Sequence, residues 1–441
     1  MSLKSPFIPF YWTKELRFPC YFTAIRHLLN SIVMRIGWIV PTWALLLTIP
    51  SVLSAQPSPP FVTVGLPGKP FGVVVSQDQQ WVFVSFASKR PGQTQGIAVL
   101  RAQEGQFKIQ RVVAMSRQPA GIVLTHDGKL LIAAAKDYVV FFDTHRLITG
   151  ESAPAFQWIS DGAKASSVDV NVTADDKTLF VSDEFARAIT VIDLDIVRAQ
   201  GYDSAENLQR LNIQGGGSAA VVGRIPVGIS PVAMTFSPDQ HWLYTTSEVA
   251  APSWRWPKVF TEENSDTSQE SQKVPEGAVI VVDVAKARVN ARKSVIARIP
   301  AGGSPVRLAL SPDGGRLFVS ARNSNAVLVF DTTKFFTDPL HAKLATIPVG
   351  KSPVPIVLVD DGKIAIIGNS NRYGVNANVS STLSVLDTTK IGTALNPIIG
   401  SIPAGAYPRN FCLSPDGQTL FLVNFISGSL QIMEVSSLPH P

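Results

Sequence analysis

Six cationic residues occupy related places in a chain that is otherwise poor in charge. Only 16% of the 441 residues are charged, against about 25% in a typical soluble protein. The six lie in, or directly after, short segments rich in Gly, Pro or Ala: Lys69, Arg117, Lys164, Arg307, Lys351 and Arg409. Guanidinium and ammonium groups that converge on a walled cavity attract carboxylates, phosphates or polyanions. If the fold brings the six together, they predict an anion site; otherwise they are ordinary solvated cations.

A second group combines aromatic and cationic side chains. One run reads Trp254, Arg255, Trp256, Pro257 and Lys258, and a later polar segment carries Arg372 and Tyr373. Aromatic rings that alternate with cations can stack on sugars or bases, or fill a groove of a partner. The alternative is a lid that packs its rings on the fold beneath it.

Side chains suited to catalysis or metal binding are sparse. After residue 55 the histidines are His126, His145, His241, His341 and His440. None of them falls in the segments that carry the six cations. The motifs C-x-x-C-H, G-x-S-x-G and H-E-x-x-H are missing from the sequence. We therefore expect no metal and no cofactor, and we expect Cys412 to behave as a small hydrophobic residue.

A repeated unit must position these residues. The segment from Arg298, RIPAGGSPVRLALSPDGGRLFVSARNSNAVLVFDTTK, recurs from Arg224, Thr346 and Ser401, with weaker copies from Phe61, Ala114 and Ser160. The acid of the S-P-D-G position marks the register at Asp78, Asp127, Asp175, Asp239, Asp313, Asp361 and Asp416. A period of about 40 to 50 residues built from short β-branched runs is typical of propeller blades. The seven copies predict seven blades.

Each copy divides into four strands. In the copy from Arg298 we expect strand A at 306–310, strand B at 316–320, strand C at 325–330 and strand D ending at 348, with turns at 311–314 and 331–334. The last copy stops after strand C at 430–435, and residues 61–64 read as an unmatched strand D. The sequence thus predicts an all-β fold, a seven-bladed β-propeller of four-stranded antiparallel blades, closed by the N-terminal strand joining the last blade.

This architecture places the six cations on one face. Strand A is innermost in a blade, so the D–A loops rim the central channel and the B–C loops lie on the same face. We expect the six cations to converge on the channel mouth, where acids of the B–C loops could pair with them: Asp137, Asp183, Glu184 and Glu248. The insertion near 251–276 extends the B–C loop of blade 4, and the insertion near 197–217 falls on the opposite face.

The repeat resembles a known family. The units I/V-P-V-G-x-x-P, S-P-D-G-x-x-L-F-V-S and V-x-V-x-D-T-T-K are similar to the YVTN-type repeat of seven-bladed β-propellers in exported bacterial and archaeal surface proteins. The likeness covers residues 61–435. The first three copies lack S-P-D-G, and the Tyr-Val-Thr-Asn strand survives only in variants such as Leu317, Phe318, Val319 and Ser320. The resemblance implies a rigid binding or interaction platform.

Two other functions stay open. Propellers with related repeats include lactonases, and in a lactonase Arg307 and Arg409 would stabilise an oxyanion while Glu248 or Asp183 activated water. The Tyr-rich leader strand expected of such enzymes is missing. The third function is binding of single-stranded nucleic acid or another polyanion, which would weaken steeply with salt. A non-catalytic platform for a protein or an anionic small molecule is the leading interpretation.

The net charge of +6 and the pI near 9.2 belong mostly to the first 55 residues. These carry Lys4, Lys14, Arg17, Arg26 and Arg35 against the single acid Glu15. Residues 34–55 show the cationic, apolar and small-residue regions of a signal peptide, with an uncleaved anchor as the alternative. We expect residues 1–33 to reflect a misassigned start and residues 56–441 to be a monomeric propeller without a membrane span, exported to the periplasm or cell surface.

Overall fold

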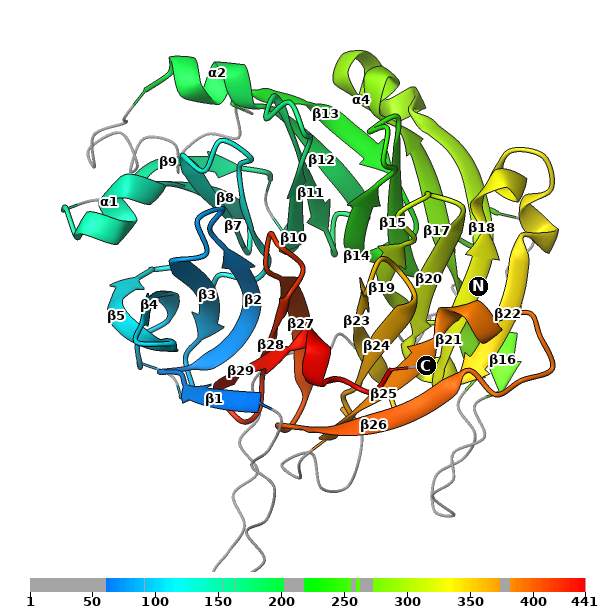
Figure 1. Cartoon of the computed structure of the whole chain (residues 1–441). Helices are drawn as coiled ribbons and strands as arrows, with labels where there is room; N and C mark the ends of the chain where they lie inside the picture. The colour runs from blue at the N-terminus through cyan, green and yellow to red at the C-terminus, as the bar shows by residue number, and fades with distance from the viewer. Residues whose placement is uncertain are drawn as a thin grey trace, which may run out of the picture. The chain divides into compact units, whose positions relative to one another are not determined.

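Seven four-stranded antiparallel sheets are arranged in a ring, which makes the fold a β-propeller (Figure 1). This computed structural model describes residues 61–90, 92–152, 154–162, 164–201, 218–254, 259–261, 273–372 and 381–440. The innermost strand of each blade contacts the innermost strand of the next, all the way round. The prediction of an all-β, seven-bladed propeller is confirmed.

Blades 1 to 6 run from the channel outward in chain order, and the described parts of blades 2 to 4 each carry one short α-helix. Blade 1 comprises β2 (Lys69–Val75), β3 (Trp81–Ala87), β4 (Gly96–Gln103) and β5 (Gln106–Ala114). Blade 2 comprises β6 (Ile122–Leu124), β7 (Leu130–Ala135), β8 (Tyr138–Asp143), helix α1 (Thr144–Thr149) and β9 (Ala155–Ser160). Blade 3 comprises β10 (Ser167–Val172), β11 (Thr178–Asp183), β12 (Ala188–Asp193), helix α2 (Leu194–Ala199) and β13 (Val221–Pro226). Blade 4 comprises β14 (Ile229–Phe236), β15 (Trp242–Val249), β17 (Lys273–Asp283), helix α4 (Val284–Asn290) and β18 (Val295–Gly303).

In the remaining three blades a short 3₁₀ turn, rather than an α-helix, follows strand C. Blade 5 comprises β19 (Pro305–Leu310), β20 (Arg316–Ala321), β21 (Ala326–Asp331) and β22 (Lys343–Pro348). Blade 6 comprises β23 (Pro353–Val359), β24 (Ile364–Asn369), β25 (Ser381–Asp387) and β26 (Ile398–Ala404). Blade 7 comprises β27 (Pro408–Leu413), β28 (Thr419–Asn424), β29 (Ser429–Glu434) and β1 (Phe61–Gly65).

The first strand of the described chain completes the last blade. Strand β1 pairs antiparallel with β29, and Phe61 lies opposite Met433. The predicted closure is therefore confirmed. Closure joins the two ends of the ring, so the backbone groups of β29 that an open array would expose are paired.

The S-P-D-G turns are held by their own side chains. In blade 5 the Asp313 carboxylate accepts hydrogen bonds from the Ser311 hydroxyl at 2.5 Å and from the backbone N–H of Gly315 at 2.9 Å. Gly314 has a φ of 73°, a conformation that glycine adopts without strain. The hydrogen bond from Ser311 is the main cause of the lowered pKa of Asp313. The acid that marks the repeat is thus explained by turn geometry.

Buried hydroxyls on strand B join neighbouring blades near the channel. The Ser320 hydroxyl accepts a hydrogen bond from the backbone N–H of Arg307 at 3.2 Å and donates one to the carbonyl of Val354 in blade 6 at 2.7 Å. The hydroxyls of Ser85, Ser182 and Thr246 make the same two kinds of contact. The Ser of the F-V-S motif therefore fixes the backbone of strand A, from which the channel residues project.

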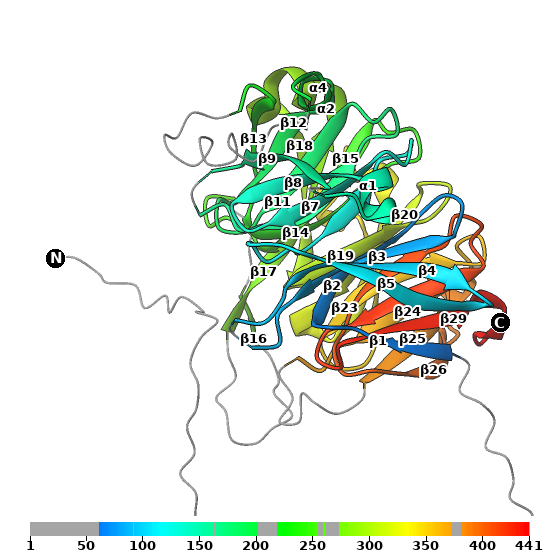
Figure 2. The same cartoon turned by 90° about the vertical axis from the view of Figure 1, so that its left-hand side faces the viewer.

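Several predicted segments lie outside the described residues, including all of residues 1–55 and most of both insertions. Within the insertion of blade 4 the described part adds β16 (Val259–Thr261), which pairs with the start of β17 and extends from the rim of the ring (Figure 2). No helix in the described part of the chain is long and apolar enough to cross a membrane.

Candidate functional site

One backbone joint recurs on the face where the D–A and B–C loops meet. A residue at the entry to strand A has a positive φ in five blades: it directly precedes the strand at Ser166, Ser304, Ser352 and Tyr407, and it is the second residue of β14 at Ser230. In four of these blades its carbonyl accepts the N–H of the residue that follows strand B, namely Glu184, Arg322, Ser370 or Phe425. The joint therefore holds Glu184 and Arg322 at the end of the channel, at equivalent places in blades 3 and 5.

Arg307 crosses the channel to an acid of a non-adjacent blade. Its Nη1 donates to Oδ2 of Asp169 at 3.0 Å, from blade 5 to blade 3. Both side chains are almost buried, at 9% and 13% exposed. Gly121 makes room for the acid, because an added Cβ would lie 2.5 Å from Oδ1 of Asp169. Burial raises the pKa of Asp169, and the attraction of Arg307 offsets this only in part.

Arg409 lies between aromatic rings at the start of β27. Its Nη1 donates to the Tyr407 hydroxyl at 2.9 Å, and its guanidinium carbon lies 4.1 Å from the centre of the Phe71 ring. Burial and three neighbouring arginines lower the pKa of Arg409. Burial alone would raise the pKa of Tyr407, but the same positive environment shifts it downward overall. The pair is therefore held in a desolvated, electropositive environment.

Two further arginines and two glutamates belong to the same environment. Nη2 of Arg322 donates to Oε2 of Glu248 at 2.6 Å, and the Arg322 side chain is 7% exposed. Arg372 lies 5.9 Å from the Tyr407 ring centre. Burial and the nearby Glu248 raise the pKa of Glu184, despite the opposing effect of the arginines. We define the arginine cluster as Arg307, Arg322, Arg372 and Arg409 with Tyr407, Asp169, Glu184 and Glu248.

An apolar collar lies beside the arginine cluster. Blade 7 contributes Tyr407, Phe425 and Ile426. Each of the other six blades contributes one residue in or just before strand A: Phe71, Ala120, Val168, Val232, Val306 and Val354. Its buried side chains are at most 9% exposed: Phe71, Val232, Val306, Val354, Tyr407 and Phe425. Little water therefore reaches this level of the channel, which strengthens electrostatic interactions there.

The structure brings two of the six predicted cations, Arg307 and Arg409, into one cluster. Lys69 lies close by, with its Nζ 5.7 Å from the ring centre of the collar residue Phe425. Arg117 is exposed and lies 5.5 Å from the Tyr138 ring centre. Lys164 and Lys351 are exposed. Among the described residues, these last three cations make no contact with the cluster.

Of the predicted loop residues that combine aromatic and cationic side chains, the structure describes two, Trp254 and Arg372. Trp254 packs against the core shared by blades 3 and 4, with Arg298 lying 5.0 Å from its ring centre. Arg372 belongs to the arginine cluster. The other predicted residues, Arg255, Trp256, Lys258 and Tyr373, lie outside the described residues.

Sequence reasoning missed Tyr407, Asp169 and Arg322. A blade-by-blade alignment carries a signal for the first two, because Tyr407 stands where four other blades have serine. Asp169 and Arg307 occupy the position held by Gly72 in blade 1 and Ala233 in blade 4, as the shared hydrogen bonds to strand B show. A charged or bulky residue at an inner position where the other blades have a small residue thus indicates a candidate site residue.

Asp183, one of the predicted opposing acids, lies in a separate buried pair. Asp183 and Asp161 are both 0% exposed. Thr190 donates a hydrogen bond to Asp183, and Ser167 donates one to Asp161. Burial raises the pKa of both acids, and mutual repulsion raises that of Asp183 further. These two carboxyls therefore hold a proton more tightly than ordinary carboxyls do.

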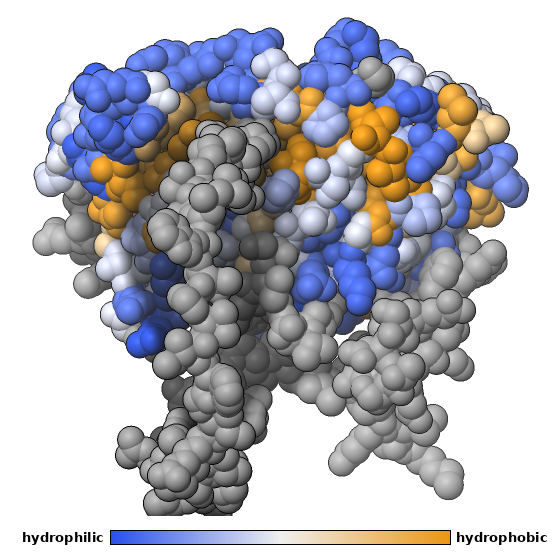
Figure 3. All heavy atoms as spheres, turned by 60° about the horizontal axis from the view of Figure 1, so that its bottom comes forward, coloured by the Kyte–Doolittle hydropathy of each residue, from blue (hydrophilic) through white to orange (hydrophobic). Residues whose placement is uncertain are grey.

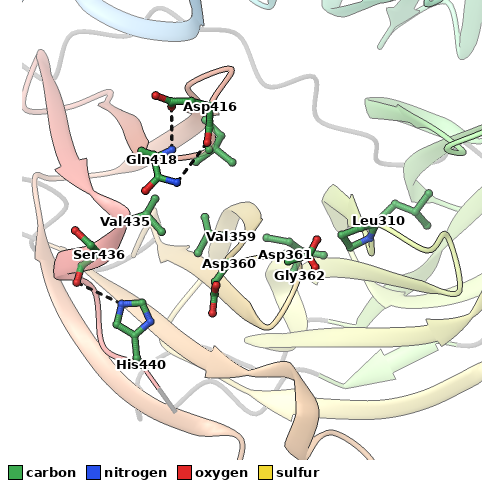
Figure 4. A pocket seen from close by; sticks show the side chains of 14 residues that line it. Leu310, Val359, Asp360, Asp361, Gly362, Asp416, Gln418, Val435, Ser436 and His440 are labelled. Atoms are coloured by element: carbon green, nitrogen blue, oxygen red, sulfur yellow. Dashed lines mark hydrogen bonds between the residues drawn. The ribbon is translucent and has the colours of Figure 1, made fainter.

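A surface cavity lies away from the arginine cluster. It has a volume of about 620 Å³ and is lined by A–B turns of blades 5 to 7 and the C-terminal segment (Figure 4). Its acids include Asp361 and Asp416, and Asp416 is already bound to Ser414 and to the N–H of Gln418. The described residues contain no group of three or more metal-ligating side chains. The arginine cluster is chemically the stronger candidate.

Comparison with known proteins supports the fold. No protein-family model matches the sequence, and no curated protein matches it significantly. Among solved structures, the chain is similar to a chain of Kuenenia stuttgartiensis hydrazine synthase with a TM-score of 0.58 and 18% identity, over 86% of this chain and 98% of that chain. At this identity the likeness is one of fold.

Proposed function

We propose that this chain is an exported, non-catalytic β-propeller of the YVTN type that acts as a rigid binding platform for an anionic ligand. The ligand face is the one formed by the D–A and B–C loops, and the channel mouth is its centre. The observation that carries the proposal is the convergence of four arginines from three blades, two of them less than one-tenth exposed.

The arginines are held before any ligand arrives. Ion pairs fix Arg307 and Arg322, while the Tyr407 hydroxyl and the Phe71 ring fix Arg409. A rigid site loses less side-chain entropy on binding, so more of the interaction energy appears as affinity. This arrangement favours recognition of an anion over the alternative that the cations are ordinary solvated side chains.

The hydrolase alternative has weaker support. Glu248 accepts a hydrogen bond from Arg322 at 2.6 Å, and Asp183 is 0% exposed. Neither carboxyl is therefore well placed to activate water on an ester at the channel mouth, because a general base needs to reach the proton it removes.

A polyanion is also less favoured. Binding along a phosphate backbone requires a row of accessible cations. The cluster arginines are instead buried or half-buried around one point, and only Arg117, Lys164 and Lys351 of the predicted set are exposed. A compact anion suits this geometry better.

Calorimetric titration of the full-length chain with acetate, benzoate, inorganic phosphate and a heparin oligosaccharide tests the proposal. We expect at least one anion to bind, and Arg409→Gln to weaken it about tenfold or more, because a charge-assisted hydrogen bond contributes about 1.5–3 kcal/mol. Arg292→Gln is the matched control on an exposed residue that follows α4. If no anion binds, or both variants bind equally well, the proposed site is wrong.

Export has a separate measurement. Mass spectrometry of the protein recovered outside the cytoplasm should give a mature N-terminus after Ser54 or Ala55. A peptide from residues 1–33 in that material would contradict both the cleavage site and the misassigned start.

A further inference from the structure

Resting on the proposed function, we propose that the arginine cluster binds a single carboxylate group carried by a small ligand with an apolar, preferably aromatic, body. Charge, hydrogen-bond geometry and the neighbouring collar each narrow the ligand class.

The charge of the cluster suits a monoanion. It contains four arginines against the carboxyls of Asp169, Glu184 and Glu248, so cations outnumber acids among the residues that define it. Two of the arginines are already paired with acids at 3.0 and 2.6 Å. In a poorly hydrated site an unpaired charge is costly. A monoanion adds the least charge to such a site, whereas a dianion or polyanion would bring more negative charge into it.

The open hydrogen-bond donors suit a planar acceptor. Nη1 of Arg409 is bound to the Tyr407 hydroxyl, and the face of its guanidinium lies on the Phe71 ring. Its buried Nε has no hydrogen-bond partner among the described residues. Nε and Nη2 share one edge of the guanidinium, and this edge matches the two oxygens of a carboxylate.

A second donor lies in the same cluster. Nη2 of Arg307 also has no hydrogen-bond partner among the described residues, although the side chain is only 9% exposed. Leaving a buried donor unsatisfied costs about 1–3 kcal/mol, and more for a charged group. Arg307 and Arg409 are close enough to interact electrostatically. An acceptor that reached both arginines would satisfy both donors.

The surroundings of these donors are apolar. Phe71 touches Arg409 and belongs to the collar with Tyr407 and Phe425. At the rim, Phe185 directly follows Glu184 and is 66% exposed. Figure 3, in which the lower side of Figure 1 comes forward, shows orange hydrophobic residues interspersed with blue hydrophilic ones on the surface that grey atoms leave uncovered. A ligand that joins one carboxylate to an apolar body would contact both kinds of surface.

Titration calorimetry with four matched probes tests the ligand class on the full-length chain. Benzoate has the proposed chemistry, acetate lacks the ring, benzamide lacks the charge, and phenyl phosphate carries more charge on a tetrahedral group. We expect benzoate to bind at least tenfold more tightly than each of the other three. Equal or tighter binding of phenyl phosphate, acetate or benzamide would overturn this inference but leave the platform standing, whereas the absence of any anion binding would remove both.

Two variants of the cluster complete the test. Arg409→Lys keeps the charge but removes the planar fork, so benzoate binding should weaken at least tenfold, with Arg292→Lys as the matched control. Glu184→Gln removes a competing negative charge, so benzoate should bind about threefold more tightly. A gain of affinity cannot come from misfolding. Unchanged or weaker binding by Glu184→Gln, or unchanged binding by Arg409→Lys, contradicts the assignment.

Discussion

The ion pair between Arg307 and Asp169 offers a quantitative test of why charges lie inside the channel. Removing one member of a buried pair typically costs about 3–5 kcal/mol, because the other charge stays buried without a counter-ion. Asp169→Val should therefore lower the free energy of unfolding by about that amount. Replacing both residues with apolar ones, in Asp169→Val/Arg307→Met, should leave stability within about 1 kcal/mol of the original chain or increase it.

The pKa of Asp169 supports this expectation. It is raised although Arg307 donates to the carboxylate at 3.0 Å, so the cost of burial exceeds the gain from pairing. A raised carboxyl pKa means that the folded state holds the proton more tightly than the unfolded chain. Stability from this group is thus greatest at acid pH and falls as the pH rises above the ordinary value of 3.8 and through the raised pKa.

The two single variants should respond differently to pH. In Arg307→Met the orphaned carboxyl can bind a proton, so its destabilisation should shrink as the pH is lowered. In Asp169→Val the orphaned guanidinium stays charged at any accessible pH, so its cost should vary little.

Urea unfolding of the full-length chain at pH 5 and pH 8 measures all four proteins. The double variant should unfold near the original midpoint but lose benzoate binding. If it is as unstable as the two single changes combined, the pair stabilises the fold after all and the argument for a binding role fails.

Three other measurements test separate parts of the structure. Ser320→Ala should lower stability by about 1–3 kcal/mol in urea, because the N–H of Arg307 and the carbonyl of Val354 lose a buried partner; no change would mean that the hydroxyl does not join the blades. Benzoate affinity should rise as the pH falls from 8 toward the raised pKa of Glu184, since a neutral Glu184 no longer competes for the arginines. Glu184→Gln should flatten this pH dependence. An equal slope in both proteins would assign the pH dependence to another group. Asp183→Asn should stabilise the chain at pH 8 and reduce the loss of stability with rising pH, because the raised pKa of Asp183 makes its ionisation unfavourable to folding; an unchanged pH profile would show that the buried pair does not titrate as described.

The repeat alone was enough to predict the architecture. Each copy alternates apolar strands with turns whose chemistry is local, and the Asp313 turn closes through neighbours within three residues. The missing fourth strand of the last copy could likewise be matched to residues 61–64 by counting. Because strand order and face follow from chain order in a propeller, the sequence also indicated that Arg307 and Arg409 would lie near the channel.

Only the tertiary structure decided what those arginines meet there. Asp169 is 138 residues from Arg307 in the chain, and no local pattern links them. The partners of Arg409 were also invisible in the sequence, because Phe71 lies in blade 1, at the other end of the chain, and Tyr407 depends on a positive φ for its position. Long-range burial sets the pKa of Asp169, Glu184 and Tyr407, since desolvation depends on every blade around the channel. The sequence determines the ring and the face on which the cations lie. Packing across the ring determines which of the charged residues come together in a site.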